Sequence, residues 1–247
     1  MFEEWKSRTL LLLGEEKLER LRKSHVIIAG LGGVGSYAVE FICRAGVGEI
    51  TIIDADVYSI SNLNRQLHAT IHSVGKKKVE VIGNHLKSIN PQVIIHTKDL
   101  YLKDDLIPQI LMETRYSYAI DAIDTLSPKT FWGYHCYKNN IPLVVSLGSG
   151  GKTNPALVQV TDIDKTYNCK LGFYYRKRLH KLGIRKGIKA VFSSEQSPTE
   201  AIIATPEDEY KKSIVGTISF MPALFGLYCA ATVINDLINQ ENTCNNV

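Results

Sequence analysis

The sequence predicts an α/β fold: a Rossmann-like, mostly parallel sheet with helices on both faces and an elaborated carboxyl-terminal half. Short apolar runs alternate with segments of helical length, which is the pattern of a parallel sheet covered by helices. A glycine-rich turn at 30–35 joins the first apolar run to the first helical segment. The 247 residues are enough to bury one full core.

The elements are expected in alternating order along the chain. Strands are predicted near residues 25–29, 50–54, 93–97, 118–123, 142–147 and 156–161. Helices are predicted near 34–46, 75–90, 104–113 and 127–139, after an amino-terminal helical arm over 1–24. The whole chain, 1–247, is interpreted as one domain with a nucleotide-binding core over 25–150. Residues 151–247 are interpreted as a substrate-binding half with a basic loop at 165–194 and an apolar helix at 213–240.

The glycine-rich turn predicts a nucleotide site. A glycine loop between a strand and a helix directs free backbone N–H groups and the positive end of a helix dipole toward phosphate. Its glycines are Gly30, Gly32, Gly33 and Gly35. Asp54 closes the next strand at the distance where a carboxylate accepts hydrogen bonds from ribose hydroxyls. The glycine loop and Asp54 together fit NAD as well as ATP. In the alternative interpretation, the glycines serve only the close packing of helix and strand.

The residues after Asp54 add charge for phosphate. Asn62, Arg65 and Gln66 lie one helical turn apart, and arginine grips phosphate oxygens with a permanent planar charge. Lys78 supplies a second cation, and Asp124, at the end of a strand, can hold Mg²⁺. In the alternative interpretation Lys78 is a solvated lysine and Arg65 forms a surface ion pair with Asp56.

Five ordered motifs, GxGGxG, DxD, NxxRQ, GxxK and DxxD, resemble the adenylating domain of the ubiquitin-activating and ThiF/MoeB/HesA superfamily over residues 5 to 150. The resemblance implies ATP and Mg²⁺ as cofactors and a homodimer in which one subunit lends an arginine to the other. It implies catalytic roles for Arg65, Lys78 and Asp124, with Asp124 as the Mg²⁺ ligand. The implied ATP-binding residues are Gly30, Gly32, Gly33, Gly35, Asp54, Asp56, Asn62, Arg65, Gln66, Lys78 and Asp124, with Arg8 from the partner subunit. Asp121 lies inside a predicted strand and is interpreted as structural.

The cysteines give little evidence of a metal centre. They stand at 43, 136, 169, 229 and 244 with no CxxC pair, so no zinc is predicted. Cys169 is the best-placed acceptor for a thioester, whereas Cys43 and Cys229 are expected to fill core space. Dispersed cysteines and a charged amino terminus without a signal-peptide pattern predict a cytoplasmic protein.

A charge-free stretch from 213 to 235 is long enough to span a bilayer. A proline, two glycines and several hydroxyl residues interrupt it. A buried core or dimer-interface helix is therefore predicted, and any membrane contact would be peripheral.

The segment 165–194 contains nine basic residues and no acidic one, so the rest of the chain is net acidic although the whole carries +4. Phe173, Tyr174 and Tyr175 are interleaved with the basic residues and offer flat faces to unstacked bases. We therefore predict that this segment binds tRNA, the alternative being a solvated charge run. The basic residues are Lys165, Lys170, Arg176, Lys177, Arg178, Lys181, Arg185, Lys186 and Lys189.

Segments 148–155, 158–166, 191–195 and 216–223 resemble the tRNA threonylcarbamoyladenosine dehydratases. The chain departs from that family at Asn168 and Cys169, where the family often has Asp-Pro. The resemblance implies ATP-dependent cyclisation of threonylcarbamoyladenosine next to the tRNA anticodon, through an acyl adenylate. The alternatives are an activator of a small sulfur-carrier or ubiquitin-like protein, a non-catalytic scaffold and, least favoured, an NAD oxidoreductase. A sulfur-transfer partner and a monovalent cation site stay open.

Overall fold

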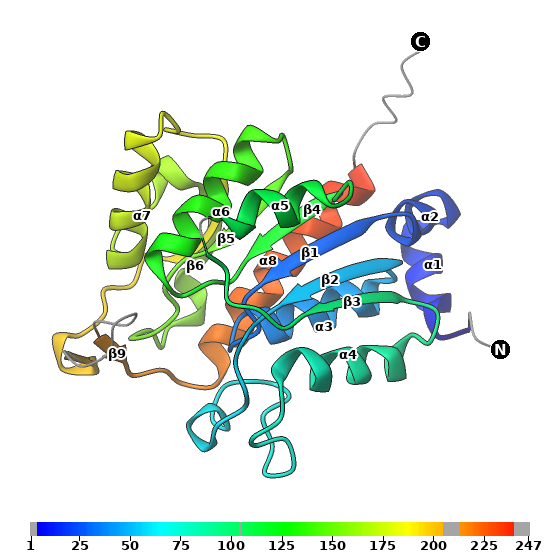
Figure 1. Cartoon of the computed structure of the whole chain (residues 1–247), viewed down its shortest axis with the longest axis horizontal. Helices are drawn as coiled ribbons and strands as arrows, with labels where there is room; N and C mark the ends of the chain where they lie inside the picture. The colour runs from blue at the N-terminus through cyan, green and yellow to red at the C-terminus, as the bar shows by residue number, and fades with distance from the viewer. Residues whose placement is uncertain (1–3, 104, 205–212, 240–247) are drawn as a thin grey trace.

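The computed structural model describes residues 4–103, 105–204 and 213–239. Its main sheet has seven strands in the order β3-β2-β1-β4-β5-β7-β6, and only β6 is antiparallel to its neighbour (Figure 1). The strands are β1 His25–Ala29, β2 Glu49–Ile53, β3 Ile94–Lys98, β4 Tyr118–Asp121, β5 Leu143–Ser146, β6 Val158–Asp162 and β7 Lys189–Ser193. A separate antiparallel pair consists of β8 Ile202–Ala204 and β9 Ser213–Val215.

Helices cover both faces of the sheet, which confirms the predicted fold class (Figure 1). The α-helices are α1 Ser7–Leu13, α2 Glu15–Arg22, α3 Gly35–Ala45, α4 Lys78–Ile89, α5 Leu106–Met112, α6 Leu126–Lys138, α7 Lys170–Lys181 and α8 Phe220–Asn239. Short 3₁₀ turns are η1 Glu4–Lys6, η2 Ile60–Asn62, η3 Pro155–Leu157, η4 Ile163–Lys165 and η5 Thr199–Ala201.

Strand β1 shows how one run of residues serves two cores. Val26 and Ile28 pack into the cluster that contains α3, α4 and α8, while Ile27 and Ala29 pack into the cluster that contains α5, α6 and α7. Every residue of β1 is buried, as expected for a central parallel strand covered on both faces. The apolar run therefore alternates between two cores instead of between core and solvent.

The prediction of a basic loop over 165–194 was wrong. Most of the segment forms η4, the twelve-residue helix α7 and the strand β7, which lies between β5 and β6. Gly172, Tyr175 and Leu179 recur at helical spacing and are buried, so α7 has an apolar face that packs on α6. The many charges on its outer face hid this periodicity.

The prediction of a helix over 213–240 was partly wrong. Residues Ser213–Val215 form β9, and α8 begins only at Phe220. Among the described residues α8 is the one helix long and apolar enough to cross a membrane, but half of its most apolar window is buried. Phe225, Cys229 and Val233 belong to the core beside α3, which confirms the prediction of a buried core helix.

The cysteines in the described residues mostly fill the interior. Cys43, Cys136 and Cys229 are completely buried, as predicted for Cys43 and Cys229, and Cys244 lies outside the described residues. Cys169 precedes α7, and its sulfur accepts a hydrogen bond from the Gly172 N–H at 3.4 Å. Cys169 therefore acts as the N-cap residue of α7.

Candidate functional site

The predicted site residues gather at the carboxyl edge of three adjacent strands. The glycine loop follows β1, Asp54 follows β2 and Asp124 follows β4, and these strands are neighbours in the order β2-β1-β4. Parallel strands end at the same edge of a sheet, so topology brings together residues that are far apart in the sequence (Figure 1). Strand β4 ends at Asp121, so Asp124 lies on the following loop instead of at the predicted strand end.

Three of the four loop glycines are required by packing. Gly30 has φ +87°, and a Cβ there would lie 2.7 Å from the Ala122 carbonyl oxygen. A Cβ at Gly35 would lie 1.8 Å from the Gly30 oxygen, and one at Gly33 would lie 2.9 Å from Pro222 of α8. For these positions the structure supports the packing explanation, and the loop has the tight strand-to-helix geometry that phosphate sites use.

Gly32 is the exception, and it faces the side chain of Gln66. The nearest atom to a Cβ at Gly32 is the amide nitrogen of Gln66, at 3.9 Å, so nothing in the fold excludes a side chain there. Gln66 is 7 % exposed, and its buried amide oxygen has no hydrogen-bond partner among the described residues. A buried polar atom without a partner is costly unless a ligand or water satisfies it. Gly32 therefore leaves open space over the glycine loop, beside a side chain that still has an unused acceptor.

Asp54 connects the glycine loop to the next strand. Its carboxylate accepts hydrogen bonds from the backbone N–H groups of Leu31, at 2.6 Å, and Asp56, at 2.8 Å. Burial raises the pKa of Asp54, and Lys78, whose Nζ lies 3.7 Å from Oδ1, opposes that rise. Each carboxylate oxygen has two acceptor positions, so these contacts leave capacity for ribose hydroxyls.

Lys78 is a buried cation and not the solvated lysine of the alternative interpretation. It is 4 % exposed, and its Nζ lies 2.7 Å from the Asp56 carboxylate. Its backbone N–H also donates to the Asp56 carbonyl oxygen at 3.1 Å. Asp56 therefore positions Lys78 at the first residue of α4, and its own side chain is 67 % exposed.

Arg65 does not form the ion pair with Asp56 that the alternative interpretation required. Its guanidinium donates to the Ser61 carbonyl oxygen at 2.7 Å and to the Asn64 side chain at 2.9 Å. No carboxylate lies within ion-pair distance of Arg65 among the described residues. The amide oxygen of Asn62 accepts from the Ser59 N–H, so Asn62 shapes the turn that presents Arg65. Arg65 thus keeps a positive charge that phosphate can neutralise.

Arg8 lies apart from the other predicted residues of its own chain. It is an exposed residue of α1, and the arm that carries it packs near Gly46, at the end of α3 opposite the glycine loop. Arg8 therefore lies outside the group of site residues in its own chain.

A model of the ThiF family matches residues 6–247. The chain belongs to the ThiF family. Among curated relatives it is similar to the tRNA threonylcarbamoyladenosine dehydratase of Bacillus subtilis, with 35 % identity over 95 % of this chain and 94 % of the relative. The molybdopterin-synthase adenylyltransferase of Salmonella typhimurium is 35 % identical over only 56 % of this chain and 55 % of the relative.

Among solved structures, this ThiF family protein is similar to the Escherichia coli tRNA N6-threonylcarbamoyladenosine dehydratase TcdA in complex with ATP. The TM-score is 0.87 at 34 % identity, and the match covers 96 % of this chain and 94 % of that one. The likeness therefore includes both the nucleotide core and the carboxyl-terminal half.

The structure of this ThiF family protein divides the nine predicted tRNA-binding residues. Lys189 forms an ion pair with Asp236 of α8 at 2.6 Å, and Arg176 hydrogen-bonds the Thr166 hydroxyl. The other seven are exposed and form no ion pair among the described residues: Lys165, Lys170, Lys177, Arg178, Lys181, Arg185 and Lys186. Phe173 and Tyr174 are exposed on the same helix, and α7 lies at the outer edge of the molecule (Figure 1).

Sequence reasoning missed two buried cations of this ThiF family protein, Lys129 of α6 and Lys152. Lys152 is 3 % exposed, and its Nζ donates to the carbonyl oxygens of Asn168 and Glu195. Burial lowers the pKa of Lys152, and Cys169 and Glu195 oppose that effect. The one sequence feature that could have indicated a buried Lys152 is its position directly after the glycine-rich segment 148–151. Lys152 holds three segments of the carboxyl-terminal half together.

The two kinds of loop glycine predict different mutant behaviour. Gly32→Ala is expected to change the free energy of unfolding by less than about 0.5 kcal/mol, because its Cβ meets no close atom. The same methyl group would occupy the space over the loop and weaken ATP binding about tenfold or more. Thermal denaturation and ATP titration measure the two effects. Gly35→Ala is the control and is expected to destabilise the fold; equal destabilisation by both variants would contradict the assignment.

Proposed function

We propose that this ThiF family protein is an ATP-dependent tRNA-modifying enzyme that dehydrates threonylcarbamoyladenosine next to the tRNA anticodon to its cyclic form. The observation that carries the proposal is how much of the chain the similarity to each kind of relative covers. It extends through the carboxyl-terminal half to the dehydratases, whereas the similarity to the molybdopterin-synthase adenylyltransferase covers little more than half of the chain. The nucleotide site supports the use of ATP, because Gly32 leaves space over the loop beside the Gln66 side chain, whose amide oxygen has no partner among the described residues.

The chemistry activates a carboxylate, which is a poor electrophile because its leaving group would be oxide. The substrate carboxylate attacks the α-phosphate of ATP, and the bond to pyrophosphate breaks to give an acyl adenylate. A nitrogen or oxygen of the same side chain then attacks the acyl carbon and displaces AMP, closing the ring. Because the nucleophile is tethered, positioning alone supplies several kcal/mol and no enzyme cysteine is required.

The residues of the carboxyl edge serve charge and orientation in this scheme. Arg65 and Lys78 would stabilise charge that develops on the phosphates, and Asp54 would hold the ribose. Mg²⁺ bound through Asp124 would neutralise phosphate charge. Arg8 would enter from the partner subunit of a homodimer.

The exposed face of α7 is proposed to hold the tRNA, because unpaired cations beside exposed aromatic rings suit a folded RNA. Replacing Lys177 and Lys181 by alanine is expected to weaken tRNA binding and to reduce the salt slope by about 2, one unit for each lysine. Binding measured across a series of salt concentrations tests this. Lys189→Ala is the matched control, since Lys189 pairs with Asp236, and an equal change of slope in the control would contradict the role of α7.

The direct test measures pyrophosphate release from ATP and Mg²⁺ with tRNA that carries threonylcarbamoyladenosine and with the same tRNA lacking it. Release only with the modified tRNA, with loss of one water from the nucleoside by mass, is expected. Silence with both tRNAs would overturn the proposal and favour activation of a small sulfur-carrier protein with a Gly-Gly tail. We place this reaction in the cytoplasm, where tRNA and ATP meet.

A further inference from the structure

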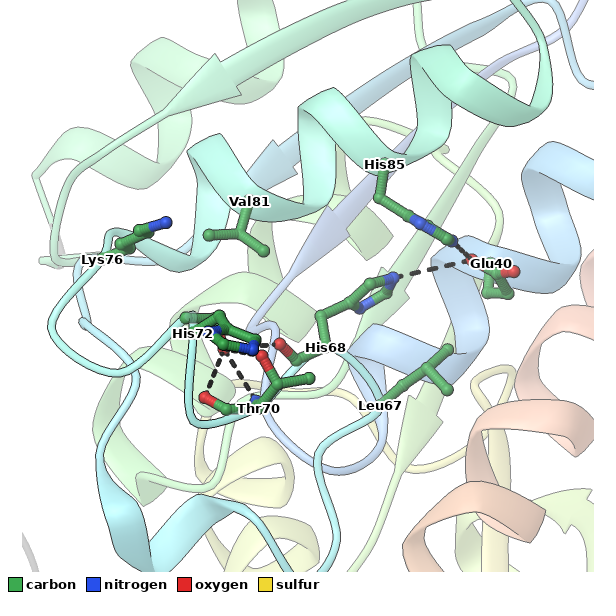
Figure 2. Close-up of a pocket in the computed structure, with 9 residues that line it drawn as sticks. Glu40, Leu67, His68, Thr70, His72, Lys76, Val81 and His85 are labelled. Atoms are coloured by element: carbon green, nitrogen blue, oxygen red, sulfur yellow. Dashed lines mark hydrogen bonds and ion pairs between the residues drawn. The ribbon is translucent and has the colours of Figure 1, made fainter.

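A second group of polar side chains lies between α3, α4 and the loop that follows Arg65. The group consists of Glu40 of α3, His85 of α4 and His68 from the loop between them. The three side chains point toward one another, and their ligand atoms all lie within 4.8 Å of one another (Figure 2). The His85 Nε2 lies 2.8 Å from the Glu40 Oε2. The His68 Nε2 lies 3.6 Å from the same oxygen, which is too long for a hydrogen bond.

His68 is the unusual member of this group. It is 8 % exposed, and neither of its ring nitrogens has a hydrogen-bond partner among the described residues. A buried imidazole without partners is destabilising, because its donor and its acceptor both lose their hydrogen bonds to water. A cation on the Nε2 side would satisfy that nitrogen and would also neutralise the Glu40 carboxylate.

The Glu40 carboxylate is held in place by a neighbouring side chain. Its second oxygen, Oε1, accepts a hydrogen bond from the Arg44 side chain at 2.7 Å, which fixes the orientation of the carboxylate. Ligands that are themselves held by a second residue are a recurring feature of metal sites.

We propose that Glu40, His68 and His85 form a binding site for a divalent transition-metal ion of the Zn²⁺ type, with solvent as the fourth ligand. Two imidazoles and one carboxylate are a ligand set that Zn²⁺ uses when one position stays open. Tetrahedral Zn²⁺ places its ligand atoms roughly 3.4 Å apart, which the observed 2.8 and 3.6 Å separations bracket. The trio lines a cavity of about 420 Å³, which gives the solvent ligand room.

This ion is different from the four-cysteine zinc that the sequence excludes, because no cysteine takes part. It would connect three segments: α3, the stretch just after Gln66, and α4, which begins at Lys78. The binding step itself does not depend on the proposed reaction, so its failure would leave the nucleotide chemistry untouched.

A comparison within the molecule supports the choice of trio. His25, Glu49 and His96 form a second group of the same composition. There, however, the buried His25 ring bonds the Thr51 hydroxyl at 2.8 Å, and His96 bonds Glu49 at 2.7 Å. The second group is therefore already satisfied and serves as an internal control.

The test uses the full chain without an affinity tag, stripped with a chelator and titrated with Zn²⁺ against a chromophoric competitor. One Zn²⁺ per chain is expected, and Co²⁺ should give the visible absorption of a four- or five-coordinate site without a thiolate charge-transfer band. Mg²⁺ should not compete, because it prefers an all-oxygen site. Failure of Zn²⁺ to bind, competition by Mg²⁺, or a thiolate band would each overturn the proposal.

His85→Ala is expected to weaken Zn²⁺ binding by at least about 100-fold, since losing a ligand costs more than losing a second-layer partner. Its side chain is 37 % exposed, so the variant should fold. Glu40→Gln is the second variant, with the same expected loss. His96→Ala is the matched control and should bind Zn²⁺ like the original chain. Unchanged binding in both His85→Ala and Glu40→Gln, or loss in His96→Ala, would overturn the assignment.

Discussion

Replacing Lys129 by methionine is expected to lower the free energy of unfolding by about 3–5 kcal/mol. Lys129 and Asp121 are completely buried, and the Lys129 Nζ lies 2.9 Å from the Asp121 carboxylate. It also donates to the Ile123 carbonyl oxygen at 3.0 Å. Removing the lysine leaves a buried carboxylate without its counter-charge, which is among the costliest single changes in a core. Urea denaturation at pH 7 measures the loss.

The loss should depend on pH in a defined direction. Burial raises the pKa of Asp121, and Lys129 opposes that rise. Without Lys129 the folded state binds a proton more readily than the unfolded state, so the variant's deficit grows as pH rises through the folded pKa of Asp121. The double variant Asp121→Asn with Lys129→Met buries no charge and should recover most of the loss. A double variant as unstable as the single one would contradict this account.

Arg65→Ala is expected to reduce the rate of pyrophosphate release by about 100- to 1,000-fold while leaving tRNA binding nearly unchanged. Arg65 forms no ion pair among the described residues and is held only by the Ser61 carbonyl and Asn64, so its charge is available for phosphate. Steady-state release of pyrophosphate and a tRNA binding titration give the two values.

Two further variants separate charge from geometry at Arg65. Arg65→Lys keeps the charge but loses the planar two-pronged grip, so an intermediate rate is expected. Arg22→Ala, on the amino-terminal arm, is the control and should keep the original rate. If Arg65→Ala released pyrophosphate at the original rate, Arg65 would have no role in the reaction. The assignment of the phosphate-binding part of the site would then be wrong.

Local pattern was sufficient for the fold class and for the edge where the site lies. The runs that became β1, β2 and β4 are recognisable by their apolar residues, and the glycine turn, Asp54 and Asp124 follow them directly. Because parallel strands end at a common edge, knowing that the strands were parallel was enough to gather these residues.

Local pattern was insufficient wherever a partner distant in sequence determines the outcome. Strand β7 inserts between β5 and β6. The residues next to β7 in the sequence carry no pattern that specifies these two partners. The many charges of α7 obscured its apolar face, which is recognisable only because it packs against α6.

The sequence by itself therefore determined a nucleotide-binding α/β chain, its ordered motifs and the concentration of positive charge in one segment. Only the tertiary structure decided which charges are already paired: Asp56 with Lys78 instead of Arg65, and Lys189 with Asp236. It also decided that Gly32, unlike its neighbours, leaves space, and that two histidines meet Glu40. The physical reason is that ion pairs and close packing depend on distances of a few ångströms in space, which periodicity along the chain does not encode.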